Sequence, residues 1–416
     1  MPPCARIGVV PMWRPDVLHR RTSTRTGRSR LSGLDGVRGL AALYVVVDHI
    51  YLRSFPGYPA TTAPFWAGWF IYGRFAVVVF IVLSGFSLAV SPARDGWRLD
   101  SVPAFLQRRA WRIIPPYWAA LVFSLLVAWL IIPQPGQGEP TPRSAFAFGL
   151  LVQDFVDAPT PNRAFWTICI EAQLYLVFPL LLLAIRRVGG LAMAAGVTVA
   201  VVMVGVLAPS VRLADAAAVR LELDFAALFA IGMMAAGIVT ASRRLQSWPW
   251  HWLAMATAAP MLVTIVIMGS PWTMANLYWV DLAFGPAIGC LLAAVATDRP
   301  GPLVRLLDTR PVRSLGSFSY SLYLTHAPIV VVLNEWLVVG RFRQGVPSFL
   351  VSVVIIVPAT VLFARGFAAL FEIPFVRHRS WRALRSALPS VHIGLFGRRV
   401  WPGGVAEPAT DARSRE

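Results

Sequence analysis

"RGLAALYVVVDHIY", residues Arg38 to Tyr51, has the apolar character of a membrane helix but contains an arginine, an aspartate and a histidine. A charge near the centre of a bilayer costs several kcal/mol unless it is paired or hydrated. Membrane helices keep such groups mainly where they bind or react with something. The stretch therefore predicts a membrane-spanning helix that carries part of a functional site.

The composition of the whole chain supports a membrane protein. Of 416 residues, 57% are hydrophobic and only 14% are charged, whereas a soluble protein of this length needs more charge to cover its surface. The net charge of +18 comes entirely from arginine, since the chain contains no lysine. The arginines gather between apolar runs, which favours contact with anionic lipid over nucleic-acid binding. We therefore expect a polytopic membrane protein with the lipid bilayer, and no nucleic acid, as partner.

The apolar runs predict an all-α fold with ten transmembrane helices. Each run is close to the ~20 residues that a helix needs to cross a bilayer. The runs cover residues 34–53, 70–91, 116–133, 166–185, 190–208, 222–240, 251–269, 277–297, 315–338 and 347–371. With the N-terminus in the cytoplasm, most of the 38 arginines fall on the cytoplasmic side. This distribution obeys the positive-inside rule and places both termini in the cytoplasm.

The charge distribution also divides the chain into three parts. Residues 1–33 are expected to be a basic, disordered arm, residues 34–375 the membrane domain, and residues 376–416 a basic cytoplasmic tail. The loop 134–165 is irregular by composition. The cysteines are far apart and show neither disulfide nor metal spacing, so no metal site is expected. Nothing in the sequence specifies an oligomeric state.

Arg38 and His49 form the first candidate group. They are eleven residues apart, three helical turns, so they share one face at roughly 16 Å along the axis. Arg38 would lie near the cytoplasmic side and His49 further out. Asp48 is about 100° away around the helix and is not an obvious partner of His49. The alternative is that Arg38 reaches lipid headgroups and His49 only packs.

A second group lies in "FLQRRAWRIIPPYW", Phe105 to Trp118. Arg109 and Arg112 are three residues apart and Arg108 and Arg112 four, so their side chains project together from a helix. Guanidinium groups on one face suit phosphate, which they bind bidentately. The alternative is an ordinary basic flank of a membrane helix.

Glu171 stands in the apolar stretch "FWTICIEAQLYLVFP", Phe165 to Pro179. A buried carboxylate needs a partner. Glu171 could orient a histidine, receive a proton, or pair with an arginine such as Arg74. Tyr175, four residues on, is expected to share its hydrogen-bond network.

The stretch "LGSFSYSLYLTHAPIVV", Leu315 to Val332, supplies Tyr323 and His326 three residues apart, with Ser319 one turn back. His326 is expected near the middle of the membrane or beyond. The alternative is a simple hydrogen bond between helices. Ser84 and Cys169 could carry an acyl group, but we expect close packing for Ser84 and plain burial for Cys169.

Six stretches in one order together resemble the acyltransferase-3 family, the membrane O-acyltransferases of bacterial surface polysaccharides and some natural products. They are "LDGVRGLAAL…DH", "FIVLSGF", "RRAWRIIPPY", "WTICIEAQLYLVFP", "LGSFSYSLYLTHAPI" and "FEIPF". The resemblance covers roughly residues 32–378. Ala172 and Ile373 depart from the family pattern, which often has an acid at the first position and an arginine at the second.

The resemblance implies a multi-pass protein of the bacterial cytoplasmic membrane. It also implies acyl-CoA as co-substrate, without a permanently bound cofactor, and a hydroxyl acceptor on a carbohydrate or a natural product such as a macrolide. His49 would be the base, Glu171 or His326 an orienting group, and Arg38 a further catalytic or donor-binding residue. The remaining expected site residues are Arg108, Arg109 and Arg112 for the donor, and Tyr175 and Tyr323 for orientation or the acceptor.

We expect direct acyl transfer, and the alternative is an acyl-enzyme on His49, Ser84 or Cys169. An inactive structural or sensory relative of the family is a further alternative. A transporter of an anionic or glycosylated small molecule is the alternative from another class, although the internal repeats common in transporters are not detectable here.

Overall fold

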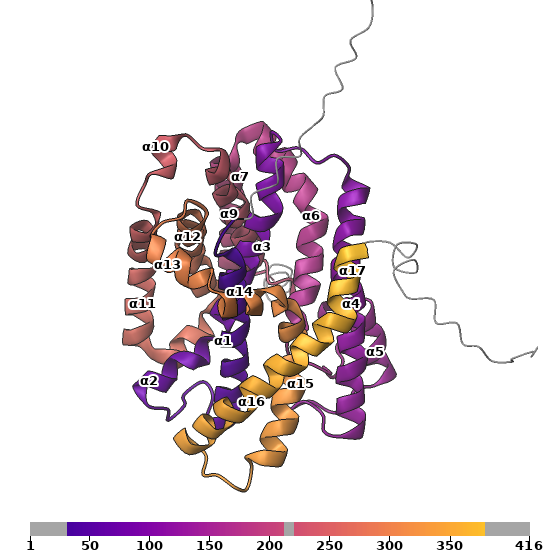
Figure 1. Ribbon diagram of the computed structural model, residues 1–416. Coiled ribbons are helices and arrows are strands. Elements are labelled where there is room, and N and C mark those ends of the chain that lie inside the picture. Colours follow the sequence, from indigo (N-terminus) through magenta and orange to yellow (C-terminus); the bar gives the residue numbers. More distant parts are fainter. Residues whose placement is uncertain (1–30, 212–219, 379–416) are drawn as a thin grey trace, which may run out of the picture.

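The computed structural model describes residues 31–211 and 220–378, and every regular element in these ranges is helical (Figure 1). Helices suit a chain of long apolar runs because each helix satisfies its own backbone hydrogen bonds in lipid. The predicted basic arm and tail lie outside the described residues, apart from residues 31–33 and 376–378.

Ten longer helices make up most of residues 31–211 and 220–378. They are α1 (Leu34–Ser54), α3 (Arg74–Arg94), α4 (Val102–Leu130), α6 (Trp166–Val188), α7 (Gly190–Leu207), α9 (Asp224–Ala235), α11 (Trp250–Ala275), α12 (Leu277–Ala296), α15 (Ser319–Leu337) and α16 (Val346–Phe367). Short helical segments complete the fold: α2 (Phe65–Gly68), η1 (Trp69–Tyr72), α5 (Pro142–Gly149), η2 (Gln153–Phe155), η3 (Ala236–Thr240), α10 (Arg243–Gln246), α13 (Gly301–Leu307), α14 (Arg310–Ser317), η4 (Ala368–Glu372) and α17 (Ile373–His378).

Within the described ranges, seven helices have the length and apolar composition of a membrane span: α3, α4, α6, α7, α11, α12 and the continuous helix Val346–His378. The other three predicted runs correspond to α1, which carries several charges, to the shorter helix Asp224–Thr240, and to α14 with α15, which are bent by 75° at their junction. The all-helical membrane fold is thus confirmed, while the count of ten spans and the orientation of the termini stay predictions.

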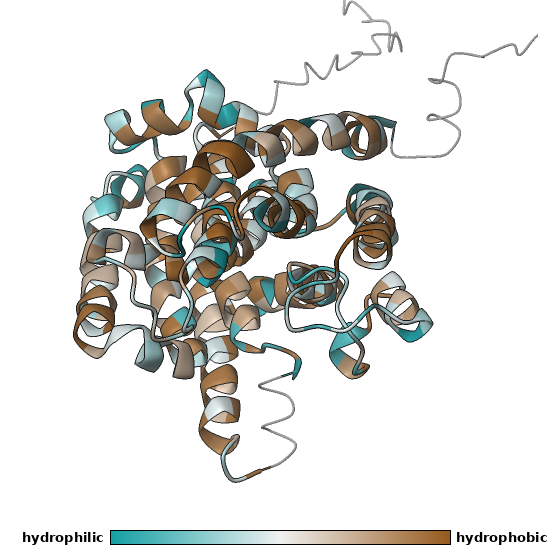
Figure 2. Ribbon diagram, turned by 90° about the horizontal axis from the view of Figure 1, so that it is seen from below, coloured by the Kyte–Doolittle hydropathy of each residue, from teal (hydrophilic) through white to brown (hydrophobic). Residues whose placement is uncertain are grey.

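Hydrophobic residues occur in helices at the outside of the bundle as well as in its interior (Figure 2), and many large ones are exposed. The candidate spans of α7 and α11 are only 17% and 11% buried, whereas that of α12 is 67% buried. α7 and α11 therefore lie at the periphery, where their apolar surfaces suit lipid, and α12 belongs to the core.

The centre of the bundle is built around α1 and α3 (Figure 1). α3 packs tightly on α9: a Cβ atom on Gly85 would lie 2.2 Å from the carbonyl oxygen of Phe229, and one on Gly232 would lie 2.0 Å from that of Val82. Such small residues let two helix backbones touch. The close packing predicted for the stretch around Gly85 is confirmed, and it fixes one wall of the cavity described below.

Two regions differ from the sequence prediction. The predicted span starts at residue 116, but α4 begins at Val102, where the hydroxyl of Ser101 accepts a hydrogen bond from the amide of Ala104 and caps the helix. The loop 134–165 is not wholly irregular. It contains α5, whose start is fixed by reciprocal hydrogen bonds between Thr141 and Ser144.

Candidate active site

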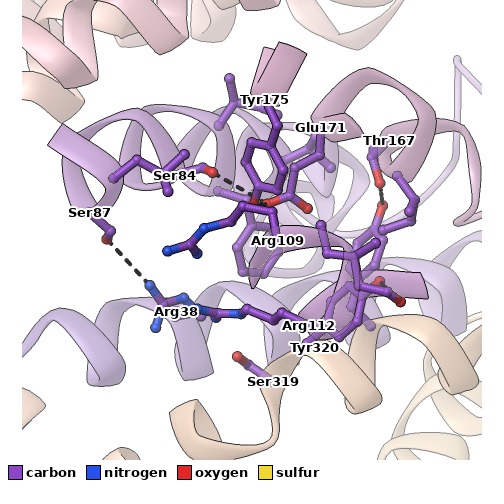
Figure 3. Close-up of a pocket in the computed structure, with 17 residues that line it drawn as sticks. Arg38, Ser84, Ser87, Arg109, Arg112, Thr167, Glu171, Tyr175, Ser319 and Tyr320 are labelled. Carbon is purple, nitrogen blue, oxygen red and sulfur yellow. Dashed lines mark hydrogen bonds between the residues drawn. The ribbon is translucent and has the colours of Figure 1, made fainter. Parts of the chain in front are cut away.

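A cavity of about 100 Å³ lies between α1, α3, α4, α6 and α15 (Figure 3). It adjoins a second pocket of about 470 Å³, and Leu88, Arg109 and Arg112 line both spaces. The second pocket is the more polar one and also contains Arg98 and Arg108. The inner cavity therefore adjoins a pocket that is lined by four arginines and by Asp95 and Asp100, and this pocket is called the vestibule below.

Three arginines meet where the vestibule joins the cavity: Arg38 from α1, and Arg109 and Arg112 from α4 (Figure 3). Arg38 is held by Asp35 at 3.0 Å and by the hydroxyl of Ser87 at 3.4 Å. The guanidinium of Arg109 lies 6.0 Å from the ring of Tyr175, and its Nε is buried and makes no hydrogen bond to any residue of 31–211 or 220–378. The structure thus brings Arg38 to the helix-spaced pair.

Arg108 is placed differently from its neighbours. It lines the vestibule but not the inner cavity, whereas Arg109 and Arg112 line both. Spacing on α4 predicted that all three project together, and the structure separates them by depth.

Midway along the cavity, Glu171 accepts hydrogen bonds from the hydroxyl of Tyr175 and, at 3.3 Å, from that of Ser84 (Figure 3). Tyr175 lies beside Glu171 as their spacing predicts. Ser84 differs from the prediction: its hydroxyl lines the cavity, and the neighbouring Gly85 makes the close helix contact. Sequence spacing could not reveal the pairing of Ser84 with Glu171, because α3 and α6 are far apart in the chain.

Arg74 does not pair with Glu171, which corrects one of the predicted alternatives. It binds Asp281 and Glu222, each at 2.6 Å, and Asp224 lies 3.7 Å away. Its guanidinium also lies 5.1 Å from the rings of Trp166 and Phe225. The cluster joins α3, α9 and α12, so it acts as a structural brace of the bundle.

His49 and His326 form a pair, with their rings edge to face and 4.7 Å between the centroids. His326 is fully buried, and its Nδ1 lies 2.7 Å from the carbonyl oxygen of Tyr323. A carbonyl only accepts, so Nδ1 carries the proton and Nε2 keeps a lone pair. Nε2 is buried and makes no hydrogen bond within the part of the chain that the structure describes.

Asp48 does not orient His49, as its angular position on the helix predicts. Its carboxylate accepts a hydrogen bond of 3.3 Å from the amide of Gly73, at the start of α3. The ring beside His49 is that of His326 on α15, one of the two orienting groups expected from the sequence, whereas Glu171 binds Tyr175 and Ser84.

Neither histidine lines the cavity. The far end of the cavity is closed by Tyr323 and Thr167, whose hydroxyls are hydrogen-bonded at 2.8 Å (Figure 3). The ring of Tyr323 lies 5.7 Å from that of Phe80 on one side and 5.7 Å from that of His326 on the other. Tyr323 therefore stands between the cavity and the histidine pair.

Other candidates have plainer surroundings. The thiol of Cys169 donates to the carbonyl of Leu151 at 2.9 Å and does not line the cavity, as expected of a buried cysteine. Tyr320 was not singled out from the sequence, yet it lines the cavity, and its spacing of three residues from Tyr323 was the available signal. Residues 31–211 and 220–378 contain no group of His, Cys, Asp and Glu side chains arranged to hold a metal ion.

Comparison with known proteins finds acyltransferases among the relatives. O-acetyltransferase OatA of Staphylococcus aureus is 23% identical over an alignment of 410 positions that covers 89% of this chain and 60% of the relative. Peptidoglycan O-acetyltransferase OatA of Listeria monocytogenes is 22% identical over an alignment of 351 positions that covers 75% of this chain and 51% of the relative. Acyltransferase MdmB of Streptomyces mycarofaciens is 36% identical over an alignment of 170 positions that covers 38% of this chain and 41% of the relative.

The chain thus spans about half to three fifths of the length of the two OatA proteins. No solved structure is detectably similar to it. The model of the acyltransferase domain that defines the acyltransferase-3 family matches residues 31–365. Because this match extends over most of the chain and includes every helix that lines the cavity, the protein belongs to the acyltransferase-3 family.

Proposed function

We propose that the protein is a membrane O-acyltransferase that moves an acyl group from acyl-CoA to a hydroxyl of a carbohydrate or natural product. One observation carries the proposal: an arginine-rich vestibule adjoins a cavity inside a helical membrane bundle, and a histidine pair lies just beyond the closed end of that cavity. The same bundle suits a bacterial cytoplasmic membrane, with the vestibule facing the cytoplasm, where acyl-CoA is made.

The arginines suit the donor. Coenzyme A carries phosphates, and guanidinium groups bind phosphate through charge-assisted, bidentate hydrogen bonds. Arg108 and Arg98 in the vestibule would hold these phosphates, and Arg109 and Arg112 would guide the rest of the donor inward. Arg38, already fixed by Asp35 and Ser87, completes this end of the cavity.

The histidine pair suits activation of the acceptor. His49 would take the proton from the acceptor hydroxyl while the hydroxyl oxygen attacks the thioester carbonyl. The C–S bond then breaks, the acyl ester leaves with the acceptor, and the proton passes to the coenzyme A thiolate. Base catalysis of this kind contributes about 10²–10⁴-fold. Since Tyr323 separates the two compartments, its side chain would have to move for the carbonyl and the hydroxyl to meet.

The acceptor class is supported by the relatives alone. One of them is named a peptidoglycan O-acetyltransferase, and another, MdmB of Streptomyces mycarofaciens, is named an acyltransferase. We therefore propose a hydroxyl on a cell-envelope glycan or on a secondary metabolite, with Glu171 and Tyr175 orienting groups in the cavity.

The test follows radiolabelled acetyl-CoA in membranes that contain the protein. We expect free coenzyme A to be released and the label to appear in an alkali-labile ester. His49→Ala should reduce transfer by at least ~10²-fold. His251→Ala, on peripheral α11, is the matched control and should leave transfer unchanged. Intact thioester in the presence of the wild-type protein would refute the proposal.

The same assay separates the open alternatives. Labelled protein that accumulates without an acceptor would indicate an acyl-enzyme, and the position of the label would identify its carrier. Ser84 is the carrier best placed in the structure, because its hydroxyl lies in the cavity beside a carboxylate, whereas Cys169 lies outside it. A transporter would move its substrate without consuming any thioester.

A further inference from the structure

The inner cavity changes from polar to apolar along its length. Its vestibule end is lined by arginine and serine side chains, and its middle by Glu171, Ser84 and Tyr175. The residues that line its far end are mainly apolar: Val77, Phe80, Ile81 and Ile168, with Thr167 and Tyr323. From Leu88 to Val77 this path follows eleven residues of α3, roughly 16 Å.

This polarity sets the direction in which a donor would lie. The phosphates of acyl-CoA are at one end of the molecule and the acyl group is at the other. With the phosphates bound by the arginines, the acyl group points toward the apolar end. This step rests on the proposed function, because it takes acyl-CoA as the donor.

Most side chains around the apolar end are buried, while Phe80 is partly exposed. Val77, Ile81 and Ile168 are at most 4% exposed, and Tyr323 and Thr167 are hydrogen-bonded across the end. An apolar cavity of about 150 Å³ accommodates benzene, with six carbon atoms. By proportion, the whole cavity of about 100 Å³ holds about four such atoms, so its apolar end alone takes only a short acyl group.

We propose that Phe80 limits the length of the acyl group that the protein accepts, so that acetyl and similarly short groups fit and longer chains do not. Phe80 is the largest apolar side chain at this end, and its ring packs at 5.7 Å against Tyr323. The other apolar residues there are smaller and more deeply buried, so they offer less space when they are shortened.

Binding of acyl-CoA thioesters to the purified protein tests this proposal without an acceptor. The series is acetyl-, butyryl-, hexanoyl- and octanoyl-CoA. The wild-type protein should bind the hexanoyl and octanoyl thioesters at least tenfold more weakly than acetyl-CoA. Phe80→Ala should strengthen the binding of the longer thioesters by about fourfold for each methylene that the enlarged cavity accommodates.

Two variants keep the outcome clear. Phe363→Ala removes the same side chain from an exposed position on α16 and should keep the wild-type preference. Phe80→Leu makes a smaller change and serves if Phe80→Ala does not fold; it should shift the preference in the same direction.

Two results have different meanings. If the wild-type protein binds none of the thioesters, the proposed donor is wrong. If it binds them without regard to length, or if both Phe80 variants keep the wild-type preference, the assignment of Phe80 is overturned while the donor stands.

Discussion

Replacing Arg74 by methionine should destabilise the bundle strongly. Arg74 is the cation of a cluster with three carboxylates, and the side chains of Asp224 and Asp281 are fully buried. Removing one partner from a buried ion pair costs about 3–5 kcal/mol, because the remaining charge loses its compensation in a low dielectric. With two contacts of 2.6 Å lost at once, we expect a loss in the upper part of that range.

The measurement is the melting temperature in one detergent, compared with a matched arginine variant. Arg53→Met breaks an ion pair with Glu335 whose partners are 24% and 39% exposed, so it should cost at most about 1 kcal/mol. Adding Asp281→Asn to Arg74→Met should recover part of the loss, because one uncompensated charge disappears. Equal melting of the two single variants, or no recovery in the double variant, would refute the electrostatic reasoning.

Three further changes test the packing and the site. Gly85→Ala should cost about 1–3 kcal/mol, measured by melting, because its Cβ would meet the Phe229 carbonyl at 2.2 Å; Gly68→Ala, with open space around it, should be neutral. His326→Ala should slow acyl transfer at least tenfold while acetyl-CoA binding stays unchanged, and weaker binding would contradict its place beyond the cavity. Glu171→Gln should lower the rate of acyl transfer. Its melting temperature should stay within a few degrees of the wild-type value, because the amide oxygen of glutamine still accepts a hydrogen bond from Tyr175.

Relations within one helix could be predicted from the sequence because helical periodicity fixes which side chains share a face. The position of Tyr175 beside Glu171 and the exclusion of Asp48 as a partner of His49 follow from residue spacing alone, and the structure agrees with both. The all-helical membrane fold was equally accessible, because it depends on the length and hydropathy of each run.

Relations between helices could not be predicted, because they depend on packing that joins distant parts of the chain. The partners of Arg74 are Asp281 on α12, Asp224 on α9 and Glu222 just before α9, and Asp281 and Glu222 lie 207 and 148 residues away in the chain. The exact start of α4 depends on one capping hydroxyl, that of Ser101, although the spacing of the arginines already indicates a helix around them. Hydropathy alone does not fix the number of spans. α1 carries several charged residues, and these lower its hydropathy.

The eleven-residue spacing of Arg38 and His49 acquires a meaning from the packing of α1 against α3. Arg38 contacts Ser87 near the vestibule end of α3, and Asp48 contacts Gly73 just before its first residue, so the two helices run antiparallel in a fixed register. The cavity extends along α3 as far as Val77, which is about one helical turn from Gly73. The spacing of Arg38 and His49, roughly 16 Å, is therefore similar to the length of the cavity along α3, and His49 lies near the far end of the cavity. Under the proposed function, a donor held at Arg38 would bring its acyl group to that end.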